Sequence, residues 1–147
     1  MSNFYSNSKY SNEKPNYKIN RLYSNKKEKI CLMFHPLFIT GKDPMWEDWN
    51  CYKYPMMIYM TDYQKLLIPY FEKIFPLKDP IDDTVQEYFD VCFDNWIGKS
   101  DWIKFINLIK ADLDKKSESE KKFYFEVISW LETALTETDV IVVEGNL

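Results

Sequence analysis

Glycine and histidine are scarce in this chain of 147 residues, which contains 3 Gly and 1 His. Loops that hold a phosphate use glycine for close backbone approach, and hydrolytic triads and most metal sites need histidine or several converging ligands. None of the motifs G-x-G-x-x-G, G-x-x-x-x-G-K-[ST], H-E-x-x-H or the EF-hand loop occurs. The single His35 precedes Pro36 in an apolar run and is expected to be a core or strand-end residue. We therefore expect no enzymatic activity, no metal ion and no cofactor.

Long apolar runs and paired cysteines are also missing. No run of about 18 apolar residues is present, and the first residues lack the basic-then-apolar order of a signal peptide. Cys31, Cys51 and Cys92 are far apart, odd in number and form no C-x-x-C motif, which favours reduced thiols. We expect a cytoplasmic protein without a membrane partner.

The charge of the chain is unevenly distributed. Residues 1–29 contain seven Lys or Arg and two Glu and carry +5, so residues 30–147 carry −9 of the total of −4. An anionic body disfavours nucleic acid and anionic membranes as partners and favours a cationic partner. Modest acidity that only keeps a protein soluble is the alternative explanation.

Aromatic residues are abundant, with 11 Tyr, 10 Phe and 5 Trp, and they predict an aromatic core. The length favours one domain. Residues 1–16 are rich in Ser, Asn and Lys with almost no aliphatic side chains, and they are expected to form a mobile arm. We predict a single α+β domain over residues 17–147.

The apolar spacing predicts about four amphipathic helices packed on a small sheet. The sheet is expected to combine a hairpin of residues 17–23 and 30–34 with a β-branched strand over 139–144. The helices are expected to begin near Thr61, Asp82, Ser100 and Ser117. Pro69 lies inside the first of these helices, where it should kink or restart it.

Residues 82–97 are the most two-sided segment of the chain. At about 100° per residue, the apolar side chains fall on one stripe and the carboxylates on a nearly opposite stripe. No Lys lies between Asp79 and Gly98, although like charges at helical spacing repel by about 0.2–0.5 kcal/mol per pair. The other predicted helices mix both charges. This contrast predicts a partner-binding surface, and its candidate residues are Asp82, Asp83, Glu87, Tyr88, Asp90 and Asp94.

Residues 45–60 form a second unusual segment, in which Met and aromatic residues cluster. Such a segment is either a buried irregular stretch of the core or an adaptable binding surface. Core packing is the commoner use of Met and Trp in a small aromatic protein.

In size, low aliphatic content and the acidic-aromatic segment from Asp82 to Trp96, the chain resembles the small cytoplasmic immunity proteins of bacterial toxin systems, including the contact-dependent growth inhibition and colicin families. The resemblance implies an inhibitor that binds the basic domain of a cognate toxin, such as a nuclease, and covers its phosphate-binding groove. Asp83, Glu87, Asp90 and Asp94 would then be charged contacts, with Asp82 and Tyr88 at their margin.

Three functions remain open at this stage. The first is a toxin inhibitor that uses the acidic segment. The second is a non-catalytic structural or regulatory subunit that uses the Met-rich aromatic segment 45–60 as an interface. The third is a phage-type antagonist that imitates DNA charge, although −9 over residues 30–147 is weak for a duplex mimic.

Overall fold

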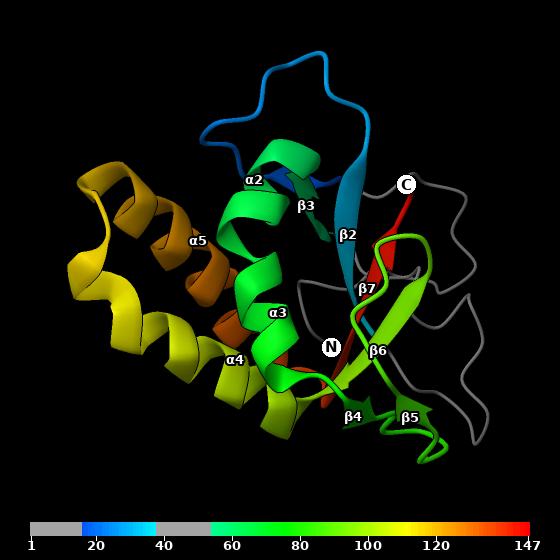
Figure 1. Cartoon of the computed structure of the whole chain (residues 1–147). Coiled ribbons are helices and arrows are strands. Elements are labelled where there is room, and N and C mark those ends of the chain that lie inside the picture. Colours follow the sequence, from blue (N-terminus) through cyan, green and yellow to red (C-terminus); the bar gives the residue numbers. More distant parts are fainter. Residues whose placement is uncertain (1–15, 38–53) are drawn as a thin grey trace.

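A mixed sheet of five strands lies at the centre of the fold (Figure 1). The computed structural model describes residues 16–37 and 54–147. Across the sheet, the strands are ordered β1 (Lys18–Ile19), β3 (Met56–Tyr59), β2 (Cys31–Pro36), β7 (Val140–Gly145) and β6 (Asp94–Gly98). Neighbouring strands are antiparallel except for β1 and β3. A separate small sheet pairs β4 (Leu77–Lys78) with β5 (Val85–Gln86).

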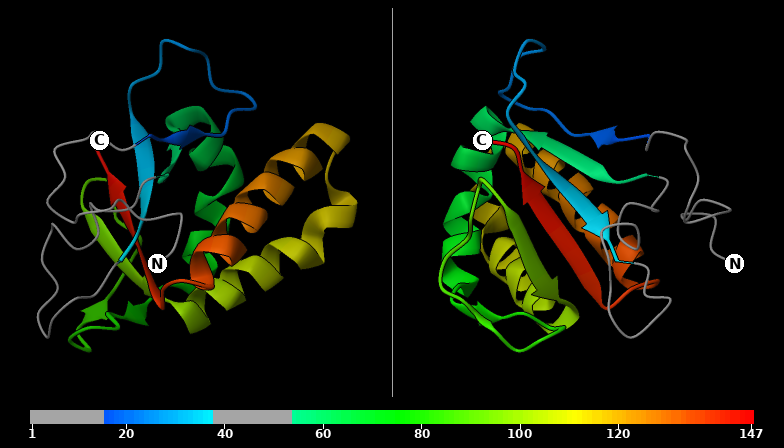
Figure 2. Two further views of the ribbon diagram at one scale, coloured as in Figure 1. Left: turned by 180° about the vertical axis from the view of Figure 1, so that it is seen from behind. Right: turned by 90° about the vertical axis from the view of Figure 1, so that its right-hand side faces the viewer.

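Within the described residues, four α-helices cover one face of the large sheet (Figure 2). They are α2 (Met60–Leu66), α3 (Ile68–Ile74), α4 (Lys99–Asp112) and α5 (Glu118–Leu135), with the short 3-10 helix η1 (Leu113–Lys115) before α5. The predicted α+β class is confirmed. The predicted N-terminal arm, residues 1–16, lies almost entirely outside the described residues.

The core lies between the helices and the sheet, and it is aromatic as predicted. The strands contribute alternate side chains to it, because successive strand residues point to opposite faces. Phe34 on β2 is fully buried and lies 5.9 Å from Trp102 of α4 between ring centroids. Phe71 of α3 lies 4.5 Å from Phe105 of α4. Each such buried side chain stabilises the fold by about 1.5–3 kcal/mol.

Three of the predicted helix features are confirmed, and one is wrong. Ser117 caps α5 by accepting a hydrogen bond from the Glu120 N–H at 3.2 Å. Pro69 restarts the helix: α2 ends before Leu67, and Pro69 lies in the first turn of α3, where its missing N–H is harmless. The segment after Ser100 is helical as α4. The predicted capping box at Thr61 is wrong, because α2 begins one residue earlier and the Thr61 N–H and hydroxyl donate to Glu28 instead.

The predicted N-terminal hairpin is wrong, whereas the C-terminal strand is confirmed. Residues 18–19 do not pair with β2, because β3 lies between them. β3 is the end of the Met-rich segment, and its apolar run of four residues offers β2 a longer partner than β1 does. β7 pairs with both β2 and β6 and is almost completely buried, as a uniformly β-branched strand requires.

The predicted acidic helix over residues 82–97 is also wrong. The segment contains β5, a series of turns and β6. The apolar residues that were expected to be buried together are not all buried. Val85 is 56% exposed and Phe93 is 70% exposed, whereas Phe89 packs on the core. Two causes oppose the helix. Aspartate side chains bind nearby backbone N–H groups instead, and residues 94–98 supply the second ladder partner that β7 needs.

A buried carboxylate fixes the polar segment before β2. Asp62 on α2 is fully buried and accepts hydrogen bonds from three successive backbone N–H groups, of Leu22 at 3.0 Å, Tyr23 at 2.6 Å and Ser24 at 3.3 Å. Removal of this carboxylate leaves three partly buried backbone N–H groups without their acceptor.

We expect Asp62→Ala to lower the free energy of unfolding by about 3 kcal/mol, measured by urea denaturation. The control is Gln64→Ala, at an exposed position of the same helix. An Asp62→Ala variant as stable as this control would show that the three hydrogen bonds do not hold the segment.

Candidate functional site

The chain between β4 and β6 forms an exposed surface that we call the acidic loop, residues 79–94. It contains six carboxylates and no Lys or Arg. It also carries four exposed large apolar side chains, and apolar side chains that gather on one surface can mark a binding site. These are Ile81 at 39%, Val85 at 56%, Tyr88 at 69% and Phe93 at 70%.

Three aspartates of the acidic loop shape its turns. Asp79, Asp82 and Asp90 each accept a hydrogen bond from the backbone N–H two residues later, at 2.8, 3.0 and 2.8 Å. These are Asx turns, the local alternative to a helix. Asp83 has a φ of 63°, a left-handed conformation that aspartate tolerates better than most residues. Hydrogen bonds from Thr84 also hold the pKa of Asp82 below its usual range.

An aromatic stack and a side-chain amide attach the acidic loop to the body. The Phe89 ring stacks on Phe71 of the core, with centroids 4.0 Å apart and planes inclined by 11°. Gln86 binds the exposed edge of β6: its amide nitrogen donates to the Trp96 carbonyl at 2.7 Å and its amide oxygen accepts from the Trp96 N–H at 2.9 Å. Gln86 thus occupies backbone groups that an added strand would otherwise use.

Asn95 makes the central connection between the loop and the sheet. Its side chain is buried, with 2% exposed. The amide nitrogen donates to the carbonyls of Asp90 at 2.7 Å and Val143 at 3.0 Å, and the amide oxygen accepts from the Asp90 N–H at 2.7 Å. One side chain therefore fixes the second half of the loop to β7.

Gly145 permits a further close contact between the loop and β7. A Cβ atom added at this position would lie 1.9 Å from the Val91 carbonyl oxygen. The Gly145 N–H donates to the Phe93 carbonyl at 3.1 Å. The end of the loop is consequently packed against β7 at backbone distance.

Two carboxylates face each other at the end of the loop. Asp94 on β6 is opposite Glu144 on β7. Because Phe93 and Gly145 form a hydrogen-bonded pair, the next pair is of the non-bonded type, in which side chains lie closer. Partial burial raises the pKa of Asp94, and burial together with the Asp94 charge raises the pKa of Glu144. The charge of Asp94 thus disfavours ionisation of Glu144.

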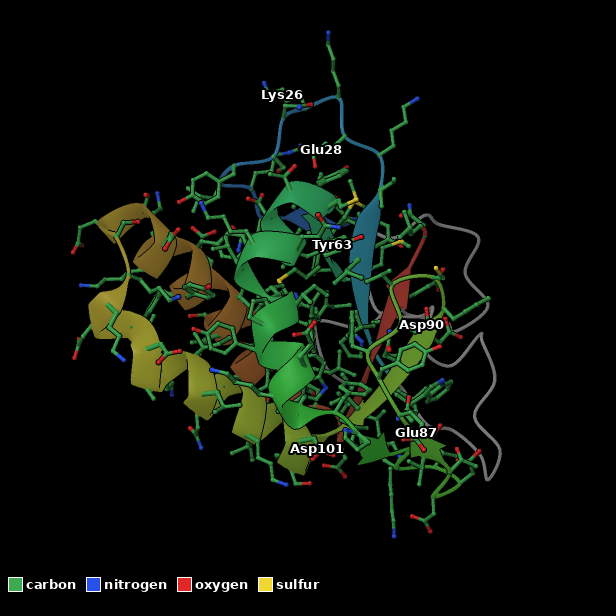
Figure 3. The ribbon with its side chains drawn as sticks, viewed as in Figure 1. Lys26, Glu28, Tyr63, Glu87, Asp90 and Asp101 are labelled. Carbon is green, nitrogen blue, oxygen red and sulfur yellow. The ribbon has the colours of Figure 1, made fainter. Side chains whose placement is uncertain are left out.

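Within residues 16–37 and 54–147, no Lys or Arg forms an ion pair with a carboxylate of the acidic loop. Among ion pairs formed between described residues, the partners are Lys104 with Asp101, Lys110 with Glu132, and Lys121 with Glu118. None involves a carboxylate of the acidic loop or Glu144. In Figure 3, Glu87 and Asp90 lie beside β5 and β6, far from the labelled Lys26.

The predicted contact residues come together on this surface, although not on one helix face. Asp82, Asp83, Glu87, Tyr88 and Asp94 are exposed, and Asp90 is half-buried because its backbone binds Asn95. The sequence prediction missed Phe93 and Val85, which it assigned to a buried stripe, and also Ile81 and Glu144. A signal for Glu144 was present in the strand pattern, since a lone carboxylate ends an otherwise apolar strand.

The other chemical groups of the described residues do not suggest a catalytic or metal centre. No cluster of three or more metal-ligating side chains occurs among residues 16–37 and 54–147. His35 is buried in β2, where burial lowers its pKa to about 4, so it is neutral at pH 7. In the same part of the chain, no helix is both long and apolar enough to cross a membrane.

We expect Asn95→Ala to release the second half of the loop. Loss of its hydrogen bonds should destabilise the protein by about 2–3 kcal/mol and accelerate hydrogen exchange of the Asp90 amide, which would lose its acceptor. The control is Asn107→Ala, at an exposed position of α4. Unchanged exchange at Asp90 would mean that the loop is held by other contacts.

Glu144→Gln should stabilise the protein while removing part of the candidate surface. A carboxyl whose pKa is higher in the folded than in the unfolded state lowers stability as pH rises above its ordinary pKa. The variant should therefore gain about 0.2–1 kcal/mol at pH 7 and lose less stability between about pH 4 and pH 7 than the wild type does. Urea denaturation at several pH values measures this, with the exposed Glu137→Gln as control. A loss of stability at pH 7 would contradict the repulsion.

Comparison with known proteins found no matching family model and no significant match to a curated protein or a solved structure.

Proposed function

We propose that this chain is a non-catalytic binding protein that neutralises a basic partner domain through the acidic loop. The observation that carries the proposal is that one surface combines exposed aromatic side chains with carboxylates that form no ion pair within the described residues. Tyr88 and Phe93 are exposed among these charges, and solubility alone does not require exposed aromatic side chains.

Charge and aromatic groups have separate tasks in this proposal. The carboxylates attract a cationic partner over a distance and accelerate encounter. After encounter, Tyr88 and Phe93 lose their water and act as anchors, the role that aromatic residues commonly have in binding hot spots. The hydrogen bonds from Asn95 and Gln86 hold the loop in place beforehand, which reduces the entropy lost on binding.

The partner class that we propose is the basic domain of a toxin, with a nuclease as the favoured case. A nuclease must present a positive groove to phosphates, and such a groove is complementary to a row of carboxylates. The resemblance to immunity proteins of bacterial toxin systems supports the same choice. Under this proposal the chain acts in the cytoplasm, where it protects the cell from its own or a neighbour's toxin.

The alternative of a structural subunit with a Met-rich interface receives less support. In the described part of that segment, Met56 and Ile58 are fully buried in β3, and Met57 and Tyr59 are half-buried. These side chains belong to the sheet, and residues 45–53 lie outside the described residues. The fold thus gives no specific reason to prefer this alternative.

The proposal is tested by capture of a partner from the native cells, followed by affinity measurement with charge variants. In the loop variant, Asp83→Asn, Glu87→Gln and Asp94→Asn remove three charges, and binding should weaken by about 100-fold and depend less on salt. The control removes three exposed charges elsewhere, through Glu72→Gln, Asp114→Asn and Glu137→Gln. Because both variants have the same net charge, a difference between them reports the position of the charges.

Cell protection provides the functional readout. Cells that produce the captured partner should survive with the wild-type chain or the control variant and die with the loop variant. Equal affinity and equal protection by the loop and control variants would overturn the proposal.

A further inference from the structure

A groove between α3 and α4 has the opposite character to the acidic loop. It has a volume of about 440 Å³ and is lined by Lys73, Ile74, Lys104, Asn107, Leu108 and Ala111. Ile74 and Leu108 give it an apolar floor, and two lysines form its rim. Its size lies within the range of about 300–1,000 Å³ that is usual for ligand pockets.

The two lysines of the rim are accessible to an incoming carboxylate. The Lys104 side chain is 70% exposed, and its ammonium lies 3.7 Å from Asp101, a long and solvated pair. Lys73 is exposed, with its ammonium 5.3 Å from the centre of the Tyr70 ring. Neither contact uses all of the donors that an ammonium has.

The acidic loop has the complementary arrangement of groups. Tyr88 is 69% exposed and follows the exposed Glu87, while Asp83 is exposed in the preceding turn. An aromatic ring on the apolar floor and carboxylates at the lysine rim would satisfy both kinds of contact at once. The loop contacts α3 through Phe89 on the side of β6, whereas the groove lies on the side of α3 that faces α4. The two surfaces therefore lie on different sides of α3 (Figure 1).

We propose that the groove between α3 and α4 binds the acidic loop of a second copy of this chain. The contact is heterologous, because the loop of one copy enters the groove of the next. A pair of copies therefore still has one free loop and one free groove, through which further copies can add. The net negative charge of the chain opposes the association in dilute salt, so it is expected to be weak. Since it covers the loop, self-association competes with binding of the basic partner, although it does not depend on the proposed function.

Complementation between two variants tests the proposal. The groove variant carries Lys73→Ala and Lys104→Ala. A second loop variant, which differs from the charge variant described above, carries Asp83→Asn, Glu87→Gln and Tyr88→Ala. Analytical ultracentrifugation at protein concentrations up to about 1 mM should show that the wild type associates and that each variant alone remains monomeric. An equimolar mixture should form dimers and nothing larger, because only one loop and one groove per pair are intact.

A control variant and a fold measurement exclude trivial causes. Lys26→Ala with Lys115→Ala removes two exposed lysines outside the groove and should associate like the wild type. Circular dichroism establishes that all variants are folded. A wild type that remains monomeric over the whole concentration range, or a mixture that remains monomeric, overturns the proposal. Because no basic partner is present, this failure would leave the test of the proposed function unaffected.

Discussion

The buried side-chain amide of Asn95 is the interaction on which the candidate surface depends. It binds the carbonyl of Val143 on the sheet and the backbone N–H and carbonyl of Asp90 on the loop, so the loop shares the rigidity of the core. The Phe89–Phe71 stack and the close approach of Val91 to Gly145 fix the same segment from two other directions. A segment of turns is thereby attached to the core at several points.

This attachment brings carboxylates close together, which makes their ionisation less favourable. Asp94 and Glu144 oppose each other across β6 and β7, and partial burial makes ionisation of each less favourable. Neither is paired with a cation among the described residues. Proteins tolerate such unfavourable arrangements where function needs them and stabilise the fold elsewhere. Here, the aromatic core beneath the sheet supplies that stability.

The parts of the fold that were predictable from sequence are those with a strong local signal. The apolar spacing and the Ser117 cap located α5, and the uniform β-branched run located β7. The pairing of β2 with β3 was not predictable from local patterns, because a strand partner is chosen by the whole sheet. For the same reason, a short β1 at the edge was mistaken for half of a hairpin.

The residues of the candidate surface were named from the sequence, but their predicted helical conformation was wrong. The lack of lysine in residues 82–97 is a feature of composition, and it does not depend on whether the segment is a helix or a series of turns. The helical stripe was misleading, since apolar residues at helical spacing also occur in a chain of Asx turns whose aromatic residues alternate between core and solvent. The high content of aspartate, together with Pro80 and the β-branched Val85, was the sequence signal against a helix in this segment.

The most direct test of the central claim is a hydrogen-exchange footprint of the chain bound to the basic partner captured from native cells. If the acidic loop is the binding surface, amides within residues 81–94 should become more protected in the complex, with little change in α5. Protection confined to α4 and α5, with the loop exchanging as in the free chain, would contradict the claim.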